Sequence, residues 1–155
     1  MTFDLARFTR AQHGPGGFTT AYAELQSGRK RSHWIWYIFP QLAGLGRSPA
    51  AMTYGLNGVA EATAYLHDPL LRDRLLAVTD AVLAQLQRNP APALADVMGS
   101  SIDAMKLVSS MTLFREVARR VDDRKLATSA NAVLQAAEPQ GFGECEFTLR
   151  EMAAS

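Results

Sequence analysis

The sequence lacks the features that mark secreted, membrane-spanning and disulfide-bonded proteins. Its 155 residues contain one cysteine, Cys145, which excludes an internal disulfide and is typical of a reducing compartment. The longest apolar run, residues 34–39, ends at Pro40 and is far shorter than the roughly 20 residues that a membrane-spanning helix needs. The first residues include an early acid, Asp4, and no apolar run, so no secretory signal is expected. The sequence therefore predicts a cytoplasmic protein with no membrane association.

A strong charge of one sign is also absent. The net charge is +1, which argues against a general attraction to nucleic acid or to a membrane surface. The charges are nevertheless unevenly spread, because residues 1–47 carry six basic and two acidic side chains, and the remainder carries ten basic and thirteen acidic ones. The N-terminal third is therefore the first place to look for an anion-binding site.

Motifs for metal ligation and for nucleophilic catalysis are missing as well. His13, His33 and His67 are isolated, and none has a second ligand at the spacing of a metal site, so we expect neither a metal nor a cofactor. Ser109 and Ser110 do not lie in a Gly-x-Ser-x-Gly setting. No catalytic residue is assigned, and whether the protein is an enzyme stays open.

Helix signals recur along the whole sequence, whereas strand signals hardly appear. Residues 48–49 and 68–69 each place a capping side chain before a proline, and further caps are predicted at 100 or 101 and at 122 or 123. Residues 32–39 are also compatible with a buried strand, but no partner strand is visible nearby, which favours a helix. The connections are too short to separate domains. We expect one all-α domain over residues 1–155, a compact irregular bundle of about eight helices.

The most unusual segment is residues 28–37, in which basic side chains run directly into aromatic ones. Backbone N–H groups at the start of a helix favour binding of phosphate or carboxylate, and arginine binds either anion through two hydrogen bonds. An aromatic ring can in addition stack on a planar ligand. The alternative is that the basic residues form a solvated turn and the aromatic residues fill the core. The candidate ligand-binding residues of this segment are Arg29, Lys30, Ser32, His33, Trp34 and Trp36.

Two further candidates follow this segment. Gln41 lies directly after it, and Arg47 belongs to the glycine-rich residues 44–49, which also lead into a predicted helix. These residues match neither the dinucleotide-binding fingerprint nor the phosphate loop, and glycines in such a place more often form a tight turn between helices. If the two loops are adjacent in space, Arg47 and residues 29–31 face one pocket.

A polar stripe is predicted on the helix that follows residue 101. Asp103, Lys106 and Ser110 lie at positions i, i+3 and i+7, and Ser109 lies at the edge of this stripe. The other faces of the helix are apolar, which indicates burial. A polar stripe on a buried helix needs water, a partner or a cavity, because an unpaired buried charge is costly. An exposed pair of Asp103 and Lys106 is the simpler alternative.

The sequence is similar to a known family in three regions: residues 28–48, 61–71 and 103–114. It resembles the bacterial domain-of-unknown-function family eighteen-ten, whose members are sometimes mislabelled as calpastatin, over about residues 3–134. The resemblance implies an all-α domain of about eight helices and implies no established activity, cofactor or catalytic residue. The basic-aromatic segment and the helix with Lys106, Ser109 and Ser110 are the hallmarks of the family.

Three functional hypotheses remain. The first is an enzyme or sensor that binds an anionic small molecule, such as a nucleotide or a phosphorylated metabolite, in a basic-aromatic pocket; if it is catalytic, His33 is the best general acid or base. The second is a protein-interaction or adaptor module without catalytic activity, whose partner the sequence does not name. The third, nucleic-acid binding, ranks last because it needs a wider basic face.

Overall fold

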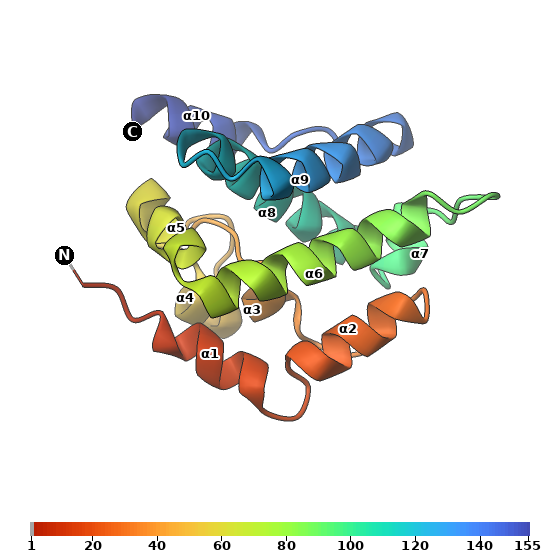
Figure 1. The fold of residues 1–155 in the computed structure, drawn as a ribbon, viewed down its shortest axis with the longest axis horizontal. Coiled ribbons are helices and arrows are strands. Elements are labelled where there is room, and N and C mark those ends of the chain that lie inside the picture. The colour runs from red at the N-terminus through yellow and green to blue at the C-terminus, as the bar shows by residue number, and fades with distance from the viewer. Residues whose placement is uncertain (1) are drawn as a thin grey trace.

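The computed structural model describes residues 2–155, and within them it contains helices and no β-strand. Figure 1 shows the arrangement of the helices. They are α1 (Ala6–His13), α2 (Phe18–Gln26), α3 (Ile35–Ile38), α4 (Pro49–Tyr54), α5 (Gly58–His67), α6 (Pro69–Leu86), α7 (Leu94–Val97), α8 (Ser101–Arg120), α9 (Arg124–Ala137), the 3₁₀-helix η1 (Glu138–Gln140) and α10 (Glu146–Ala154). The predicted all-α class is confirmed.

The expected number of about eight helices was too low, because the described chain contains ten α-helices. Two of them, α3 and α7, have only four residues each. A helix of one turn is too short to show a 3.6-residue period, so the sequence pattern does not distinguish it from a turn. The helix that was expected to begin at Ser32 begins at Ile35 instead.

The predicted caps were largely correct. The Ser48 hydroxyl accepts a hydrogen bond from the N–H of Ala51 at 3.1 Å, and the Asp68 carboxylate accepts one from the N–H of Leu71 at 3.1 Å. Of the alternatives at the start of α8, Ser100 is the cap. A side-chain cap satisfies an N–H group that has no partner within the helix, which is why these starting points follow from local sequence.

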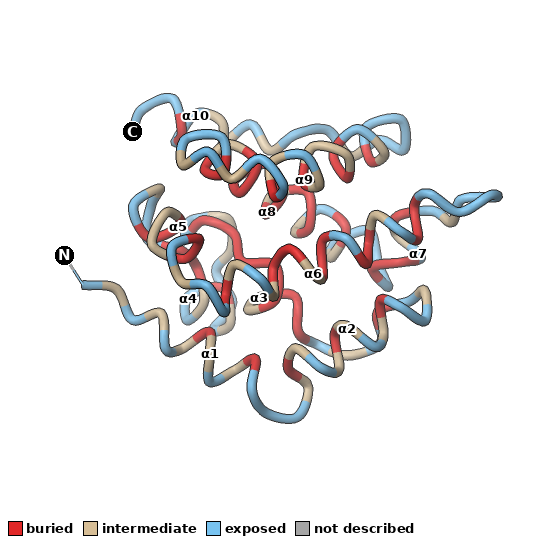
Figure 2. The backbone as a smooth tube through the Cα atoms, viewed as in Figure 1, coloured by how far each residue is buried: buried red, intermediate tan, exposed pale blue. Residues whose placement is uncertain are grey.

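α8 lies at the centre of the molecule and packs against α3, α5, α7, α9 and α10. Figure 2 shows the burial along α8 and along α6, which crosses the middle of the view. Eleven residues of α8 are buried, and they include Leu107, Met111 and Phe114. The first turns of α8 are less enclosed than its middle, since Ile102 and Met105 are exposed. The exposed side of these turns is where the candidate site lies.

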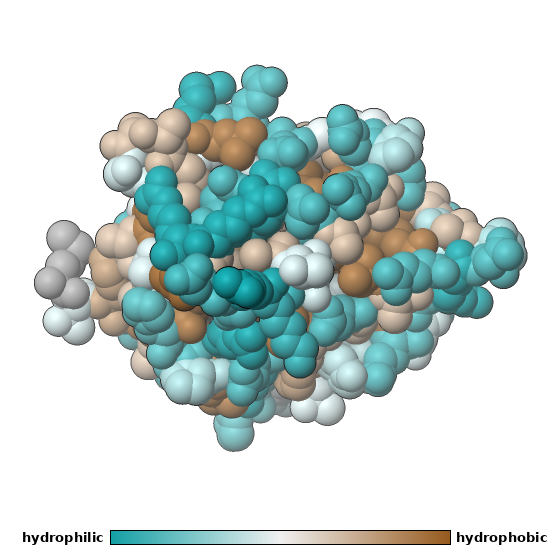
Figure 3. Space-filling view, turned by 45° about the horizontal axis from the view of Figure 1, so that its top comes forward, coloured by the Kyte–Doolittle hydropathy of each residue, from teal (hydrophilic) through white to brown (hydrophobic). Residues whose placement is uncertain are grey.

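The surface is mixed in character. Figure 3 shows one face on which hydrophilic side chains predominate and hydrophobic ones form separate patches. Among residues 2–155, no helix is both long and apolar enough to span a membrane.

Candidate functional site

The basic-aromatic segment is held in shape by a single carboxylate, that of Glu24 on α2. Glu24 accepts hydrogen bonds from the backbone N–H groups of Arg31 at 2.8 Å and Ser32 at 3.0 Å, and from the indole N–H of Trp34 at 2.9 Å. The Ser32 hydroxyl donates a fourth bond to the same carboxylate. Bonds to an ionised acceptor are stronger than neutral ones. The segment is therefore a fixed loop, although the side chains of Arg29, Arg31 and His33 are exposed to solvent.

The pKa of Glu24 reflects these contacts. Burial raises the pKa, but the four hydrogen bonds outweigh it and lower the pKa from 4.5 to about 2. We expect Glu24→Gln to lower the free energy of unfolding at pH 7 by about 2–3 kcal/mol, because an amide accepts these bonds less strongly than a carboxylate. Urea unfolding monitored by circular dichroism measures this loss.

The pH dependence of this prediction has a definite sign. A carboxylate whose folded-state pKa is depressed contributes its full stability above the unfolded value of 4.5 and loses it as the pH falls towards about 2. The stability difference between wild type and Glu24→Gln should therefore shrink across this interval. If the stability difference between the two proteins stays constant from pH 6 to pH 2.5, the negative charge of Glu24 is not the source of the stabilisation.

Lys30 is buried where this loop meets the connection between α7 and α8. Its backbone N–H donates to the carbonyl of Val97 at 2.8 Å. Gly99 adopts a φ of +83°, and a Cβ there would lie 2.8 Å from the Lys30 carbonyl oxygen. This close approach requires glycine. The side chain of Lys30 is only 5% exposed, and its ammonium lies 2.8 Å from the Asp103 carboxylate.

A lysine–aspartate–lysine cluster results, formed by Lys30, Asp103 and Lys106. The Lys106 ammonium lies 3.5 Å from the second oxygen of Asp103. Each ammonium also lies over an indole ring: Lys30 is 4.9 Å from the centre of the Trp34 ring, and Lys106 is 4.0 Å from that of Trp36. Cation–π contacts of this kind fix the positions of the two charges. Two cations share one carboxylate, so the cluster carries an excess positive charge.

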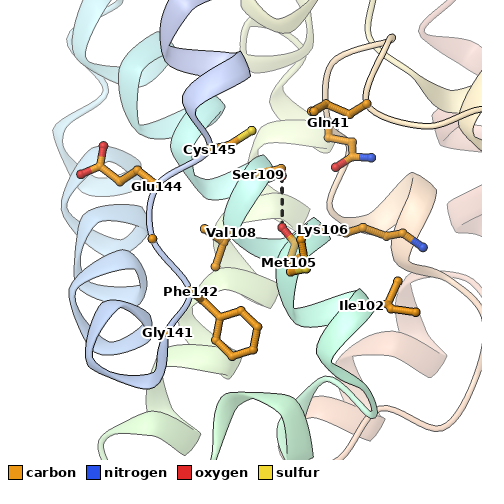
Figure 4. A pocket seen from close by; sticks show the side chains of 12 residues that line it. Gln41, Ile102, Met105, Lys106, Val108, Ser109, Gly141, Phe142, Glu144 and Cys145 are labelled. Atoms are coloured by element: carbon orange, nitrogen blue, oxygen red, sulfur yellow. Dashed lines mark hydrogen bonds between the residues drawn. The ribbon is translucent and has the colours of Figure 1, made fainter.

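Lys106 also lines a pocket of about 550 Å³ beside the first half of α8, which we call the α8 pocket. Figure 4 shows Gln41 and Lys106 on one side of it, Phe142 and Glu144 on the other, and α8 between them. The volume is in the range of small-molecule sites. Its lining residues are Gln41, Leu45, Ile102, Met105, Lys106, Val108, Ser109, Gly141, Phe142, Gly143, Glu144 and Cys145.

The wall formed by residues 141–145 is tied to α8 by two contacts. The guanidinium of Arg115, a buried residue, donates to the Glu144 carboxylate at 2.7 Å, and the N–H of Cys145 donates to the Thr112 hydroxyl at 3.2 Å. The hydrogen bond from Arg115 lowers the pKa of Glu144 against a smaller opposing effect of burial. The pocket therefore has a preformed shape, and its one carboxylate is already neutralised by a partner.

A second hollow, which we call the Lys30 hollow, adjoins the start of α8. It has a volume of about 360 Å³, and Ile102 lines both it and the α8 pocket. Its basic side chains are Arg31 and His33, which are exposed, and the buried Lys30. Its lining residues are Lys30, Arg31, Ser32, His33, Met98, Gly99, Ser100, Ile102 and Asp103. The two hollows meet at Ile102, in the first turn of α8.

The structure brings together most of the residues singled out from the sequence. Those in the cluster or lining one of the two hollows are Lys30, Ser32, His33, Gln41, Asp103, Lys106 and Ser109, and Trp36 lies under the Lys106 ammonium. The Ser109 hydroxyl donates a hydrogen bond to the carbonyl of Met105, in its own helix, at 3.1 Å.

Four of the singled-out residues lie elsewhere. Trp34 is completely buried, where it forms the floor under Lys30. Ser110 is also completely buried, and its hydroxyl has no hydrogen-bond partner among residues 2–155. Arg29 and Arg47 are exposed and line neither hollow. Arg47 therefore shares neither hollow with Lys30 and Arg31, and its glycine-rich turn lies with Gly46 near Trp36.

Sequence reasoning missed the far wall of the α8 pocket and its apolar lining. Residues 139–143 indicate only a loop, and nothing in their sequence shows that Phe142 lines a pocket. Ile102 and Met105 belong to a helix whose apolar residues otherwise predict burial, yet they are 65% and 61% exposed. Their exposure depends on which helices cover α8, and the sequence of α8 does not contain that information.

The fold and site together define an all-helical protein with a partly apolar pocket beside a lysine–aspartate–lysine cluster. The family model described as "Protein of unknown function (DUF1810)" matches residues 2–138, and the chain belongs to this family. Among solved structures, it is similar to the conserved hypothetical protein Rv1873 from Mycobacterium tuberculosis, with 39% identity, a TM-score of 0.83 and 99% of each chain covered. No curated protein matches the chain.

Within residues 2–155, no three histidine, cysteine, aspartate or glutamate side chains lie close enough together to hold a metal ion.

Proposed function

We propose that this protein binds an anionic small molecule, a phosphorylated metabolite or nucleotide, in the α8 pocket. The observation that carries the proposal is the excess positive charge of the cluster at the pocket's edge. Asp103 pairs with Lys30 at 2.8 Å and with Lys106 at 3.5 Å, so it does not neutralise both cations. Lys106 is the more exposed of the two, and it lines the pocket. A phosphate or carboxylate there would complete the charge balance.

The lining of the pocket supports a ligand that also has an apolar part. Ile102 and Met105 are two of the four large hydrophobic residues that are exposed in residues 2–155, and both line the α8 pocket. A pocket with apolar walls and a few convergent polar groups is the usual form of a small-molecule site. A ligand that covers Ile102 and Met105 gains their burial in addition to the charge contact.

The electrostatic surroundings favour an anion over a cation. Glu144 is the only carboxylate that lines the α8 pocket, and Arg115 holds it at 2.7 Å. On the other side of Ile102, the Lys30 hollow adds the exposed side chains of Arg31 and His33. A ligand with more than one phosphate would extend from Lys106 towards these residues.

The test is a thermal-shift screen of the protein against nucleotides, sugar phosphates and organic acids. A ligand at 100 times its dissociation constant adds about 2.7 kcal/mol of stability, which raises the melting temperature by about 5–10 °C for a chain of this length. Lys106→Ala should weaken binding of any hit by about 10–100-fold, because it removes a charged hydrogen-bond donor. Lys125→Ala, an exposed lysine on α9 that lines neither hollow, is the matched control.

A screen without hits, together with a stoichiometric protein partner whose binding is lost in Ile102→Asp or Met105→Asp, would contradict the proposal. The exposed apolar side chains would then belong to the surface of an adaptor module.

A further inference from the structure

Gln41 is a buried residue whose side chain is left without a partner. Its backbone is fixed, because its carbonyl accepts the N–H of Leu56 at 2.9 Å and the carbonyl of Leu56 in turn accepts the N–H of Ala43 at 2.8 Å. Gln41 is only 7% exposed. Its amide forms no hydrogen bond with any residue from 2 to 155, and Figure 4 shows the amide projecting towards Lys106 at the α8 pocket.

The other two buried glutamines show what this amide lacks. Gln12 donates to the carbonyl of Tyr37 at 2.8 Å, and Gln85 donates to the carbonyl of Leu25 at 3.0 Å. Both are as deeply enclosed as Gln41, with exposures of 3% and 8%. Gln41 differs in that its amide nitrogen and oxygen still reach solvent, because Ser110 Oγ is the only fully buried side-chain nitrogen or oxygen without a partner among residues 2–155. The amide of Gln41 is therefore accessible from the α8 pocket and can pair with a ligand that supplies both a donor and an acceptor.

Phe142 supplies a complementary surface on the opposite wall. It is half-buried and lines the α8 pocket between two glycines. A Cβ placed on Gly141 or Gly143 would meet no atom within 4 Å, so the loop on either side of Phe142 is open, whereas Phe142 itself packs partly against the core. The loop is fixed to α8 through Glu144 and Arg115 at 2.7 Å, which holds the ring in place. An aromatic ring that is fixed and accessible suits stacking against a planar base.

We propose that the ligand class of the α8 pocket is a nucleoside phosphate, whose base lies against Phe142 and is read along one edge by Gln41. This inference rests on the proposed function, since Lys106 takes the phosphate. A primary amide offers a donor and an acceptor side by side, which matches the adjacent donor and acceptor on the edge of a nucleobase. A sugar phosphate without a base would reach Lys106 and leave Gln41 unpaired.

The experiment is isothermal titration of the full chain with AMP, GMP, CMP, UMP and ribose 5-phosphate. We expect at least one nucleotide to bind ten times more tightly than ribose 5-phosphate. Gln41→Met keeps the length of the side chain and removes its donor and acceptor. It should weaken binding of that nucleotide at least tenfold and leave ribose 5-phosphate unchanged. Gln135→Met, at an exposed glutamine on α9, should change neither affinity.

Phe142→Leu provides an independent variant if Gln41→Met does not fold, and it should also weaken the nucleotide selectively. Equal affinity of all five probes for wild type, or equal weakening of all five in Gln41→Met or Phe142→Leu, would overturn the inference and leave the proposed anion site standing. If no probe binds to wild type, both the nucleotide class and the phosphate site at Lys106 are wrong.

Discussion

Replacement of Arg7 by alanine is expected to lower the free energy of unfolding by about 3–5 kcal/mol, because it leaves a buried carboxylate without its cation. The guanidinium of Arg7 grips Glu61 with two hydrogen bonds of 2.8 and 3.0 Å. The Glu61 side chain is 1% exposed, and that of Arg7 is 13% exposed. Burial raises the pKa of Glu61, but the bonds from Arg7 and from Asn57 lower it overall.

The same guanidinium joins α1 to α4 and α5, through partners there that lie 46 to 54 positions further along the sequence. From α1, Arg7 donates to the carbonyl of Thr53 at 2.8 Å and to that of Gly55 at 3.1 Å, at the end of α4. Glu61 on α5 also accepts the N–H of Asn57 at 2.8 Å, so it closes the start of its own helix. Removal of Arg7 therefore loosens α1, α4 and α5 together and leaves Glu61 with Asn57 as its remaining partner.

Urea unfolding followed by circular dichroism measures the effect, and Arg10→Ala is the matched control. Arg10 lies on the same helix, but its ion pair with Asp4 is 3.7 Å long and exposed on both sides. Such surface ion pairs contribute little to the free energy of unfolding, so Arg10→Ala should change it by less than about 0.5 kcal/mol. If Arg7→Ala and Arg10→Ala lower the free energy of unfolding equally, the ion pair of Arg7 and Glu61 does not contribute strongly to the stability of the fold.

Replacement of Trp34 by alanine is expected to cost about 3–5 kcal/mol, as large core truncations do. Trp34 is completely buried and packs against Phe39 at a ring separation of 6.1 Å. Its indole N–H donates to Glu24 at 2.9 Å, and its ring lies under Lys30. The variant therefore loses apolar packing, a hydrogen bond to a charged acceptor, and the support of the cluster at the site.

Trp36→Ala is the informative comparison, because Trp36 is only half-buried and lies under Lys106. It should destabilise the fold clearly less than Trp34→Ala does, and it should weaken ligand binding by releasing the Lys106 ammonium. Unfolding curves and titrations of both variants separate the two roles. Equal destabilisation with no change in binding would mean that both indoles serve only the core, as an adaptor module requires.

Local interactions explain most of what was predictable about the fold. The caps at Ser48, Asp68 and Ser100 each act within three residues, so the chain around them contains all the information that starts these helices. The four-residue helices α3 and α7 were harder to predict, because one turn has too few residues for a period. Tertiary packing stabilises such short helices, and the local sequence pattern carries no sign of that packing.

At the candidate site, too, local sequence identified the residues and tertiary packing decided how they are arranged. The sequence singled out Lys30, Asp103 and Lys106 as separate candidates, but only the fold places Lys30 against a carboxylate 73 positions away. The two tryptophans are two residues apart and chemically identical in sequence, yet one fills the core and the other supports the pocket's lysine. Which of them is buried depends on the elements that pack around α3.

The sequence by itself determined the helical class, the starting points of the main helices, the absence of a disulfide and the membership of a family. These properties depend on composition and on contacts between residues close along the chain. The tertiary structure alone decided that Gln41, Lys106 and Phe142 meet around one pocket and that Arg7 and Glu61 pair across 54 positions. Such contacts depend on how whole helices pack, because burial and charge pairing between distant residues are set by the complete fold.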